Sequence, residues 1–126
     1  MELSYLSFFT GAAGLDIGLE RAGFRCKLAC EIDKDARATI RANYPLVPII
    51  NDILQSSSKD ILEAAKLSKE DVFLIAGGPP CQSFSTAGKR RGLADVRGAA
   101  MLKFLDIVKD ISPRYVLMEN VRGLLS

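Results

Sequence analysis

Residues 72–82 read Val72-Phe73-Leu74-Ile75-Ala76-Gly77-Gly78-Pro79-Pro80-Cys81-Gln82, an apolar run that ends in a glycine and proline turn. A short apolar run bounded by such residues is typical of a buried strand. Proline cannot donate to a sheet ladder, so the turn ends the strand and presents Cys81 beyond it. Ligands of open α/β sheets bind there. Cys81 is therefore a candidate nucleophile, with an inert buried thiol as the alternative.

Strands and helices alternate on both sides of this segment. The apolar patterns predict strands over 3–9, 24–32, 47–50, 72–76 and 115–118. They predict helices near 15–22, 34–43, 58–65 and 101–108, with a long polar loop over 77–97. This alternation favours an α/β fold with about five parallel strands and flanking helices. We expect residues 1–126 to be part of one domain whose sheet is incomplete, because the fifth strand leaves an open edge.

Composition sets few limits on function. The 126 residues are 48% hydrophobic and 25% charged, which is ordinary for a globular domain. A net charge of +2 is too small to indicate a nucleic-acid partner by itself. The basic residues Lys89, Arg90, Arg91 and Arg97 do gather in one glycine-containing stretch, for which a solvated loop is the default interpretation.

The other cysteines indicate a reducing compartment. Three cysteines form no disulfide-like framework, and the chain has no histidine to complete a zinc site with Cys26 and Cys30. We predict that these two residues face the core of a strand and that no metal is used. Without a signal peptide or an apolar stretch of membrane-spanning length, the sequence predicts a soluble intracellular protein with no membrane partner.

Three strand ends carry residues suited to a ligand. Glycines follow the first predicted strand at 11 and 14, Glu31 lies near the end of the second, and Asp52 follows the third. Glycines allow close approach of a ligand, an acid about twenty residues later commonly binds ribose, and a carboxylate can accept from an exocyclic amine. Singly, these residues could be turn glycines, a helix cap or a solvated acid. Together they predict a nucleoside-containing cofactor.

A dinucleotide fits less well than a nucleoside without phosphates. The glycine loop lacks the full G-x-G-x-x-G spacing that places a pyrophosphate on a helix N-terminus, so a dehydrogenase is the weaker alternative. No Walker lysine is present either.

The ordered motifs closely resemble the DNA (cytosine-5)-methyltransferase family. They are Phe-Thr-Gly-Ala-Ala-Gly-Leu at 9–15, Glu31-Ile32-Asp33, Asn51-Asp52-Ile53, Gly-Pro-Pro-Cys-Gln-Ser-Phe-Ser at 78–85 and Glu119-Asn120-Val121. The resemblance implies a Rossmann-like methyltransferase sheet and S-adenosylmethionine as cofactor. It implies that Glu31 holds the ribose, Ile32 packs on the adenine, and Asp52 with Ile53 fixes the adenine edge. The other cofactor-binding residues it implies are Phe9, Gly11, Ala13, Gly14, Leu15 and Gly78.

The same resemblance implies catalytic roles. The Cys81 thiolate would add to carbon 6 of cytosine and raise the electron density at carbon 5. Glu119 would share a proton with ring nitrogen 3. Asn120 would brace the turn, and the Pro80 carbonyl would accept from the amino group of cytosine.

The predicted loop is suited to nucleic acid. A target base inside a duplex must be flipped out before a nucleophile can reach it. Small residues would make the loop mobile and its basic residues would meet phosphates. The predicted nucleic-acid-binding residues are Gln82, Ser83, Ser85, Lys89, Arg90, Arg91 and Arg97.

Several family motifs are absent from these 126 residues, including the target-recognition region. We therefore expect a C-terminal half or partner subunit and an inactive isolated chain. A role in restriction-modification and a cytoplasmic or nucleoid location follow from the resemblance, or a nuclear location in a eukaryote. A transfer RNA methyltransferase, a regulatory subunit and a non-catalytic remnant stay open as alternatives.

Overall fold

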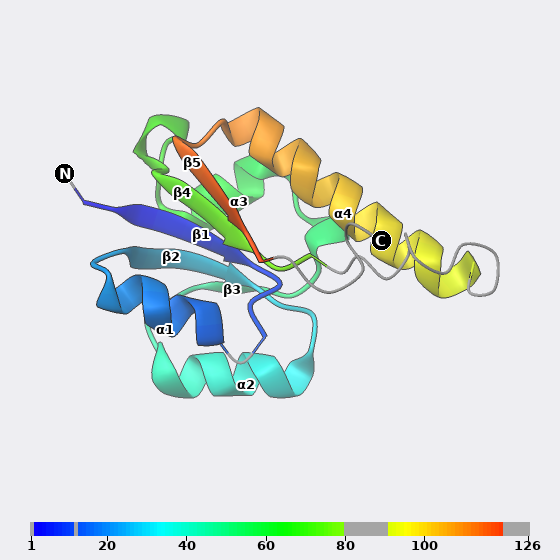
Figure 1. The fold of residues 1–126 in the computed structure, drawn as a ribbon, viewed down its shortest axis with the longest axis horizontal. Helices are drawn as coiled ribbons and strands as arrows, with labels where there is room; N and C mark the ends of the chain where they lie inside the picture. The colour runs from blue at the N-terminus through cyan, green and yellow to red at the C-terminus, as the bar shows by residue number, and fades with distance from the viewer. Residues whose placement is uncertain (1, 12, 80–90, 120–126) are drawn as a thin grey trace.

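The computed structural model describes residues 2–11, 13–79 and 91–119, with the backbone alone for 91–97. Five parallel strands form one sheet, as the sequence predicted, and their order is β3-β2-β1-β4-β5 (Figure 1). The strands are β1 (Ser4–Phe8), β2 (Arg25–Cys30), β3 (Ile49–Ile50), β4 (Leu74–Gly77) and β5 (Tyr115–Met118). The helices are α1 (Gly14–Arg21), α2 (Lys34–Asn43), α3 (Ser58–Ala65) and α4 (Arg91–Ile111), with 3₁₀ turns η1 (Ile53–Gln55) and η2 (Lys69–Asp71).

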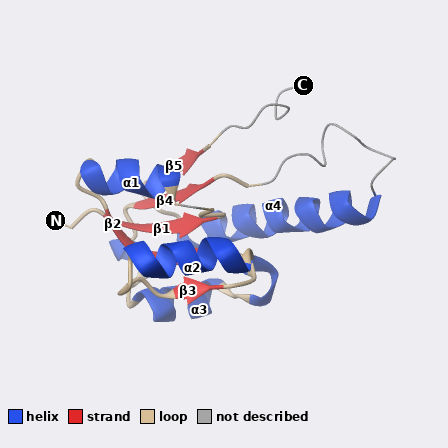
Figure 2. Ribbon diagram, turned by 90° about the horizontal axis from the view of Figure 1, so that it is seen from below, coloured by secondary structure: helices blue, strands red, loops and turns tan. Residues whose placement is uncertain are grey.

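Helices cover both faces of the sheet (Figures 1 and 2). On one face, α3 and α4 pack on alternate residues of the central strands, with Leu6, Ile75 and Phe104 fully buried. On the other face, α1 packs on Tyr5 and Leu74, while α2 packs through Ile40 on Ala29. Strands buried on both sides read as continuous apolar runs, which is why the sequence pattern located them.

Local capping fixes where two helices begin. The Asp33 carboxylate accepts from the backbone N–H of Ala36 at 2.8 Å, which confirms the predicted cap of α2. Ser57 and Asp60 form a reciprocal capping box at the start of α3. The Asp33 cap also fixes the turn between β2 and α2, next to Glu31, the residue predicted to bind the ribose.

A bulge in β2 sends the two described cysteines to opposite faces. The β1–β2 register shifts between Tyr5 and Leu6, so Cys26 pairs with Tyr5 while Cys30 pairs with Phe8. Cys26 packs in the α1 layer, and Cys30 is buried in the α3/α4 core. Both face the core as predicted. Without the bulge, residues four apart in a strand would share one face.

The predicted loop over 77–97 is too long, because α4 begins at Arg91 and runs for 21 residues. The glycines at 92 and 98 suggested a loop, yet each costs a helix only about 1 kcal/mol relative to alanine. Burial of Ala100, Met101 and Phe104 in the following turns stabilises the helix, and it continues through both glycines. Across the part of the chain that the structure describes, no helix has the length and apolar character to span a membrane.

Candidate functional site

A cavity of about 440 Å³ lies at the carboxyl ends of the strands. Six of the ten predicted cofactor residues line it: Phe9, Glu31, Ile32, Asp52, Ile53 and Gly78. The remaining lining residues are Cys30, Asn51, Leu54 and Ala100. Cys30, Asn51 and Leu54 adjoin predicted site residues in the sequence, whereas nothing in the sequence marked Ala100. The cavity lies where open parallel sheets bind ligands.

The glycine loop borders this cavity without lining it. Gly11 adopts a φ of 59°, and a Cβ placed on Gly11 or Gly14 would meet nothing within 4 Å, so both open onto free space. Ala13 is buried against Ala29 and Ile40 at the start of α1. Leu15 packs in the α1 layer. The two glycines therefore leave room for a ligand, while Ala13 and Leu15 anchor the loop.

Glu31 is the most constrained residue of the site. It is 9% exposed, and its carboxylate accepts from the N–H of Gly11 at 2.6 Å and of Asp33 at 2.8 Å. Its own N–H donates to the carbonyl of Ile50 at 2.9 Å. One side chain thus joins the glycine loop to the turn before α2. Each carboxylate oxygen can accept more than one hydrogen bond, so acceptor capacity is left for a ligand hydroxyl.

Asp52, the acid after β3, uses one of its two carboxylate oxygens to cap a 3₁₀ turn. Asp52 accepts from the N–H of Leu54 at 2.9 Å through Oδ1 and so caps η1. No hydrogen bond of Oδ2 is found among the described residues, and Asp52 lines the cavity. Ile32, at the rim, is 68% exposed and offers an apolar surface. The cavity therefore combines carboxylate acceptors with an apolar wall, as a nucleoside requires.

Glu119 adjoins the cavity through Gly78. The N–H of Glu119 donates to the carbonyl of Gly77 at 2.9 Å, which extends the β4–β5 pairing by one residue. A Cβ on Gly78 would lie 2.9 Å from Glu119 Oε2, so Gly78 brings the backbone at the cavity close to this carboxylate, and a larger residue would require the Glu119 side chain to move. Several predicted site residues lie outside the described residues or have no described side chain: Pro80, Cys81, Gln82, Ser83, Ser85, Lys89, Arg90, Arg91, Arg97 and Asn120.

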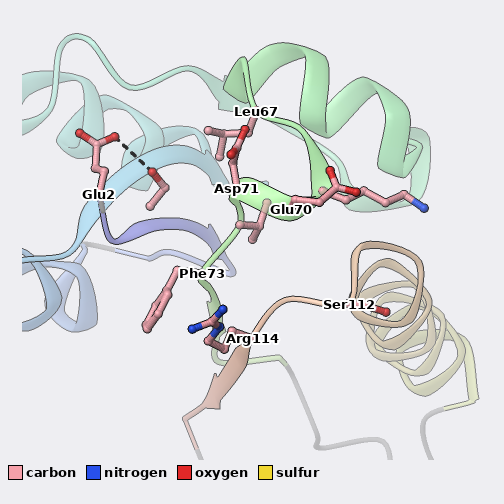
Figure 3. A pocket seen from close by; sticks show the side chains of 10 residues that line it. Glu2, Leu67, Glu70, Asp71, Phe73, Ser112 and Arg114 are labelled. Atoms are coloured by element: carbon pink, nitrogen blue, oxygen red, sulfur yellow. Dashed lines mark hydrogen bonds between the residues drawn. The ribbon is translucent and has the colours of Figure 1, made fainter.

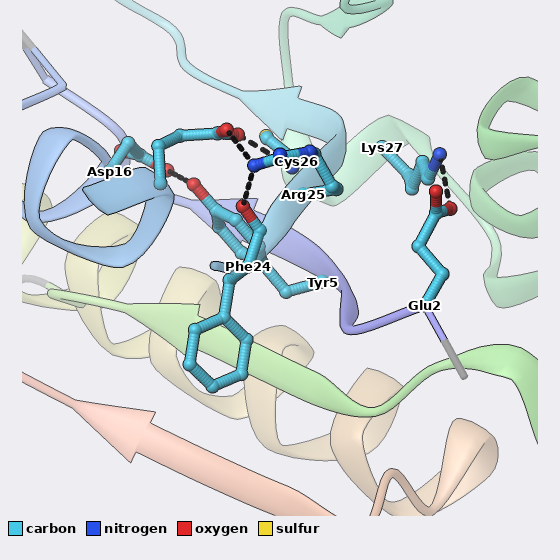
Figure 4. Close-up of polar contacts among 8 residues, drawn as sticks. Glu2, Tyr5, Asp16, Phe24, Arg25, Cys26 and Lys27 are labelled. Carbon is cyan, nitrogen blue, oxygen red and sulfur yellow. Dashed lines mark hydrogen bonds and ion pairs between the residues drawn. The ribbon is translucent and has the colours of Figure 1, made fainter. Parts of the chain in front are cut away.

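A buried polar contact behind the glycine loop was not predicted from the sequence (Figure 4). The hydroxyl of Tyr5 donates to Asp16 Oδ1 at 2.7 Å, and Asp16 is 3% exposed. Burial raises the pKa of Asp16 above that of an ordinary aspartate. The contact fixes the first turn of α1 to β1. An aspartate in the first turn of a helix gives no signal of burial, so its partner is found only in the fold.

The pKa values of both described thiols are raised. Burial, and then the carboxylates of Glu31 and Asp52, raise the pKa of Cys30 to about 12. Burial, and then Asp16, raise the pKa of Cys26 to about 12. Thiols with such pKa values stay protonated at neutral pH and are poor nucleophiles. Within the described ranges, no group of three or more histidine, cysteine or acidic side chains is arranged to hold a metal.

A second depression, of about 630 Å³, lies at the opposite edge of the sheet (Figure 3). It is formed where the strands begin, between Glu2, Asp71 and Arg114, whose guanidinium lies 5.9 Å from the centre of the Phe73 ring. It is larger than the cavity at the carboxyl edge. Ligands of open α/β sheets bind at the carboxyl edge, however, and in the part of the chain that the structure describes the amino edge carries no comparable glycine loop. We therefore assign the site to the smaller cavity.

A parallel sheet with a glycine loop after β1, an acid directly after β2 and another after β3 is the arrangement of the S-adenosylmethionine-dependent methyltransferases, the class to which the structural neighbours of this chain belong. The sequence pattern of C-5 cytosine-specific DNA methylases matches residues 3–126. The chain belongs to this family.

Individual relatives agree with this assignment. The chain is 46% identical over its whole length to the type II methyltransferase M.AquIA of Picosynechococcus, and 44% identical over 98% of its length to M.FnuDI of Fusobacterium nucleatum. It superimposes with a TM-score of 0.81 on 34% of a DNA modification methyltransferase from an E. coli prophage, at 32% identity. The chain spans 51% of M.AquIA and 34% of M.FnuDI.

Proposed function

We propose that the protein containing this chain transfers a methyl group from S-adenosylmethionine to carbon 5 of cytosine in DNA. The observation that carries the proposal is the cavity at the carboxyl edge, where Glu31, Asp52 and Gly78 lie together. Gly78 also lies next to the Glu119 side chain, so the cofactor cavity and the predicted catalytic acid are adjacent.

The cavity fits the cofactor. The open space at Gly11 and Gly14 admits the methionine part, Glu31 accepts from the ribose hydroxyls, and Asp52 with Ile32 meets the adenine. When bound, S-adenosylmethionine supplies an electrophilic methyl group. The polar groups of the chain bind and orient it, and the apolar wall around Ile53 excludes water.

The proposed chemistry at the base uses side chains that follow β4 and β5. The Cys81 sulfur forms a bond to carbon 6, and the electron pair of the 5,6 double bond moves to carbon 5, the atom that becomes methylated. Glu119 gives a proton or a short hydrogen bond to ring nitrogen 3, which makes this addition easier. Removal of the proton from carbon 5 then expels the Cys81 thiolate and restores the ring. Asn120 and the Pro80 carbonyl orient the turn and the base.

The proposed DNA contacts lie between β4 and the first turns of α4. A flipped cytosine has to reach Cys81, and the basic residues among 82–97 would bind the phosphates around it. Such contacts are independent of sequence. The choice of target sequence therefore rests with residues elsewhere in the protein.

We also propose that a C-terminal half covers β5. Tyr115, Val116 and Leu117 are 59%, 44% and 41% exposed, so both faces of this strand meet solvent. Strand β5 is also an edge of the sheet, and an exposed apolar edge strand is a site for further pairing. The relatives are about twice to three times as long as this chain, which leaves ample length for such a half.

A covalent trap tests the chemistry. DNA containing 5-fluorocytosine at the target should form a stable adduct with the complete protein, because carbon 5 then carries no removable proton. We expect Cys81→Ser to abolish the adduct and to lower methyl transfer at least about a thousandfold. An adduct that persists in Cys81→Ser contradicts the assignment.

Three further outcomes separate the alternatives. Equal labelling of transfer RNA would move the substrate from DNA to RNA. Binding of S-adenosylhomocysteine without any transfer would favour a regulatory or remnant protein. Binding of NAD without S-adenosylhomocysteine would favour a dehydrogenase. For the partner, we expect the isolated 126 residues to be inactive until a C-terminal half is added, and robust specific methylation by the isolated chain would contradict this.

A further inference from the structure

Arg37 holds the backbone beside the cofactor cavity. It lies in the first turns of α2, and its Nη1 donates to the carbonyl of Ile32 at 2.5 Å and to the carbonyl of Glu31 at 3.3 Å. These carbonyls belong to two residues whose side chains line the cavity. A guanidinium at this place therefore acts on the site without lining it.

The contact matters most for Ile32. Glu31 is held by Gly11, Asp33 and Ile50 as well, through its carboxylate and its N–H. The carbonyl of Ile32 has only Arg37 as a partner among the hydrogen bonds of the described residues. The Ile32 side chain is 68% exposed, so packing does little to fix it. Its direction depends on the backbone that Arg37 holds.

We propose that Arg37 is a positioning residue for the nucleoside end of the cofactor. By fixing the two carbonyls, it holds Ile32 at the rim of the cavity as an apolar surface for adenine. The inference rests on the proposed function, because it takes the ligand of this cavity to be an adenosyl group. A charge-assisted hydrogen bond contributes more than a neutral one, so its loss should be measurable.

The same helix supplies a matched control. Arg41 lies four residues later, in the last turn of α2, and its side chain is exposed. Among the described residues, Arg41 takes part in neither of the two ion pairs, Arg25 with Glu20 and Lys27 with Glu2. Removing Arg41 changes the net charge by the same amount as removing Arg37. A difference between the two variants thus reports the carbonyl contacts and not the charge.

Calorimetry with S-adenosylhomocysteine on the complete protein is the primary test. We expect Arg37→Ala to weaken binding roughly tenfold, since its charge-assisted hydrogen bonds to the carbonyls of Ile32 and Glu31 are lost, and Arg41→Ala to leave it unchanged. Arg37→Lys keeps the charge but replaces the planar fork by an ammonium, so it should retain part of the affinity. In steady state, KM for S-adenosylmethionine should rise while kcat stays constant. Equal effects of Arg37→Ala and Arg41→Ala, or a fall in kcat alone, would overturn the proposal.

A double-mutant cycle tests whether Arg37 acts through Ile32. In an Ile32→Ala background, Arg37→Ala should weaken binding less than twofold further, because the side chain that it positions is gone. Full additivity would show that the two residues act independently and would refute the proposal. If Arg37→Ala does not fold, the same cycle is run with Arg37→Lys. Failure of the wild-type protein to bind S-adenosylhomocysteine would refute the proposed function, whereas binding insensitive to Arg37 would refute only this inference.

Discussion

The two halves of the sheet, β3-β2-β1 on the cofactor side and β4-β5 on the base side, are built differently. On the β3-β2-β1 side, Glu31 connects the glycine loop to the turn before α2 and pairs with Ile50 of β3. On the β4-β5 side, three of the four β5 residues are more than 40% exposed, and the predicted nucleophile follows β4. The hydrogen bonds of Glu31 on the cofactor side all join residues between Gly11 and Ile50. On the base side, the edge strand β5 is exposed to solvent, and we propose that a C-terminal half covers it.

This difference suggests that cofactor binding and methyl transfer depend on different parts of the protein. A pocket fixed by short local hydrogen bonds can bind a ligand without the rest of the protein, whereas an exposed edge strand needs a partner. We therefore expect the chain to bind cofactor more readily than it catalyses methyl transfer. Four measurements can break or sharpen this contrast.

The largest expected contrast is in thiol reactivity. With pKa values of about 12, Cys26 and Cys30 are about one part in ten thousand thiolate at pH 8. We expect iodoacetamide to modify Cys81 rapidly and both β2 thiols only after addition of guanidinium chloride. Mass spectrometry of the labelled peptides measures this. Cys81→Ser is the control and should show no fast phase, and rapid labelling of Cys30 would contradict the buried site.

A core substitution should show that the two sides share one hydrophobic centre. Phe104 is fully buried, and its ring centre lies 5.6 Å from that of Phe8 and 5.8 Å from that of Phe9. We expect Phe104→Ala to lower the free energy of unfolding by about 3–5 kcal/mol in urea denaturation. The adjacent, 44% exposed Leu105 is the control, and Leu105→Ala should cost less than about 1 kcal/mol. Equal losses would mean that α4 packs on the sheet differently.

The carboxylate at the end of β2 tests the cofactor side. We expect Glu31→Ala to weaken binding of S-adenosylhomocysteine by about 1–3 kcal/mol, because hydrogen bonds to a charged group are lost. Glu119→Gln, on the other side of Gly78, should change this affinity little and lower the rate of methyl transfer instead. Calorimetry and a labelled-methyl assay separate the two effects. Loss of cofactor binding in Glu119→Gln alone would reverse the division of roles.

The smallest effect concerns the buried acid behind the glycine loop. Burial raises the pKa of Asp16 above the ordinary 3.8, so folding favours the neutral carboxyl. The stability that Asp16 contributes is complete below pH 3.8 and is lost as the pH rises through its folded pKa. Asp16→Asn should thus unfold at higher urea than wild type at pH 7, by on the order of 1 kcal/mol. This gain in stability over wild type should disappear near pH 3.5. An Asp16→Asn variant that gains no stability over wild type at pH 7, or gains more near pH 3.5 than at pH 7, would contradict this.

Sequence patterns located the features that depend on residues close together in the chain, namely the strands and the residues at their ends. Apolar runs marked all five strands, and residues that follow strand ends, such as Glu31 and Asp52, fell at one edge because parallel strands share a direction. Features that depend on neighbours distant in sequence were missed. The β2 bulge, the Tyr5–Asp16 contact and the lining residue Ala100 each require a packed partner that no local pattern names. The early start of α4 was missed because packing overrides the low helix propensity of glycine.

Ala13 bears on how this protein can change under mutation. It holds a φ of 68° while its methyl group is buried against Ala29 and Ile40. Left-handed backbone costs a non-glycine residue about 1–2 kcal/mol, and burying one methyl group returns about 1 kcal/mol. Glycine at this position would remove both the backbone cost and the gain from burying the methyl group. Because the two are similar in size, the substitution should change stability little. Because alanine and glycine codons differ by a single base, position 13 can change between these residues at nearly constant stability, although it directly precedes the helix beside the cofactor cavity.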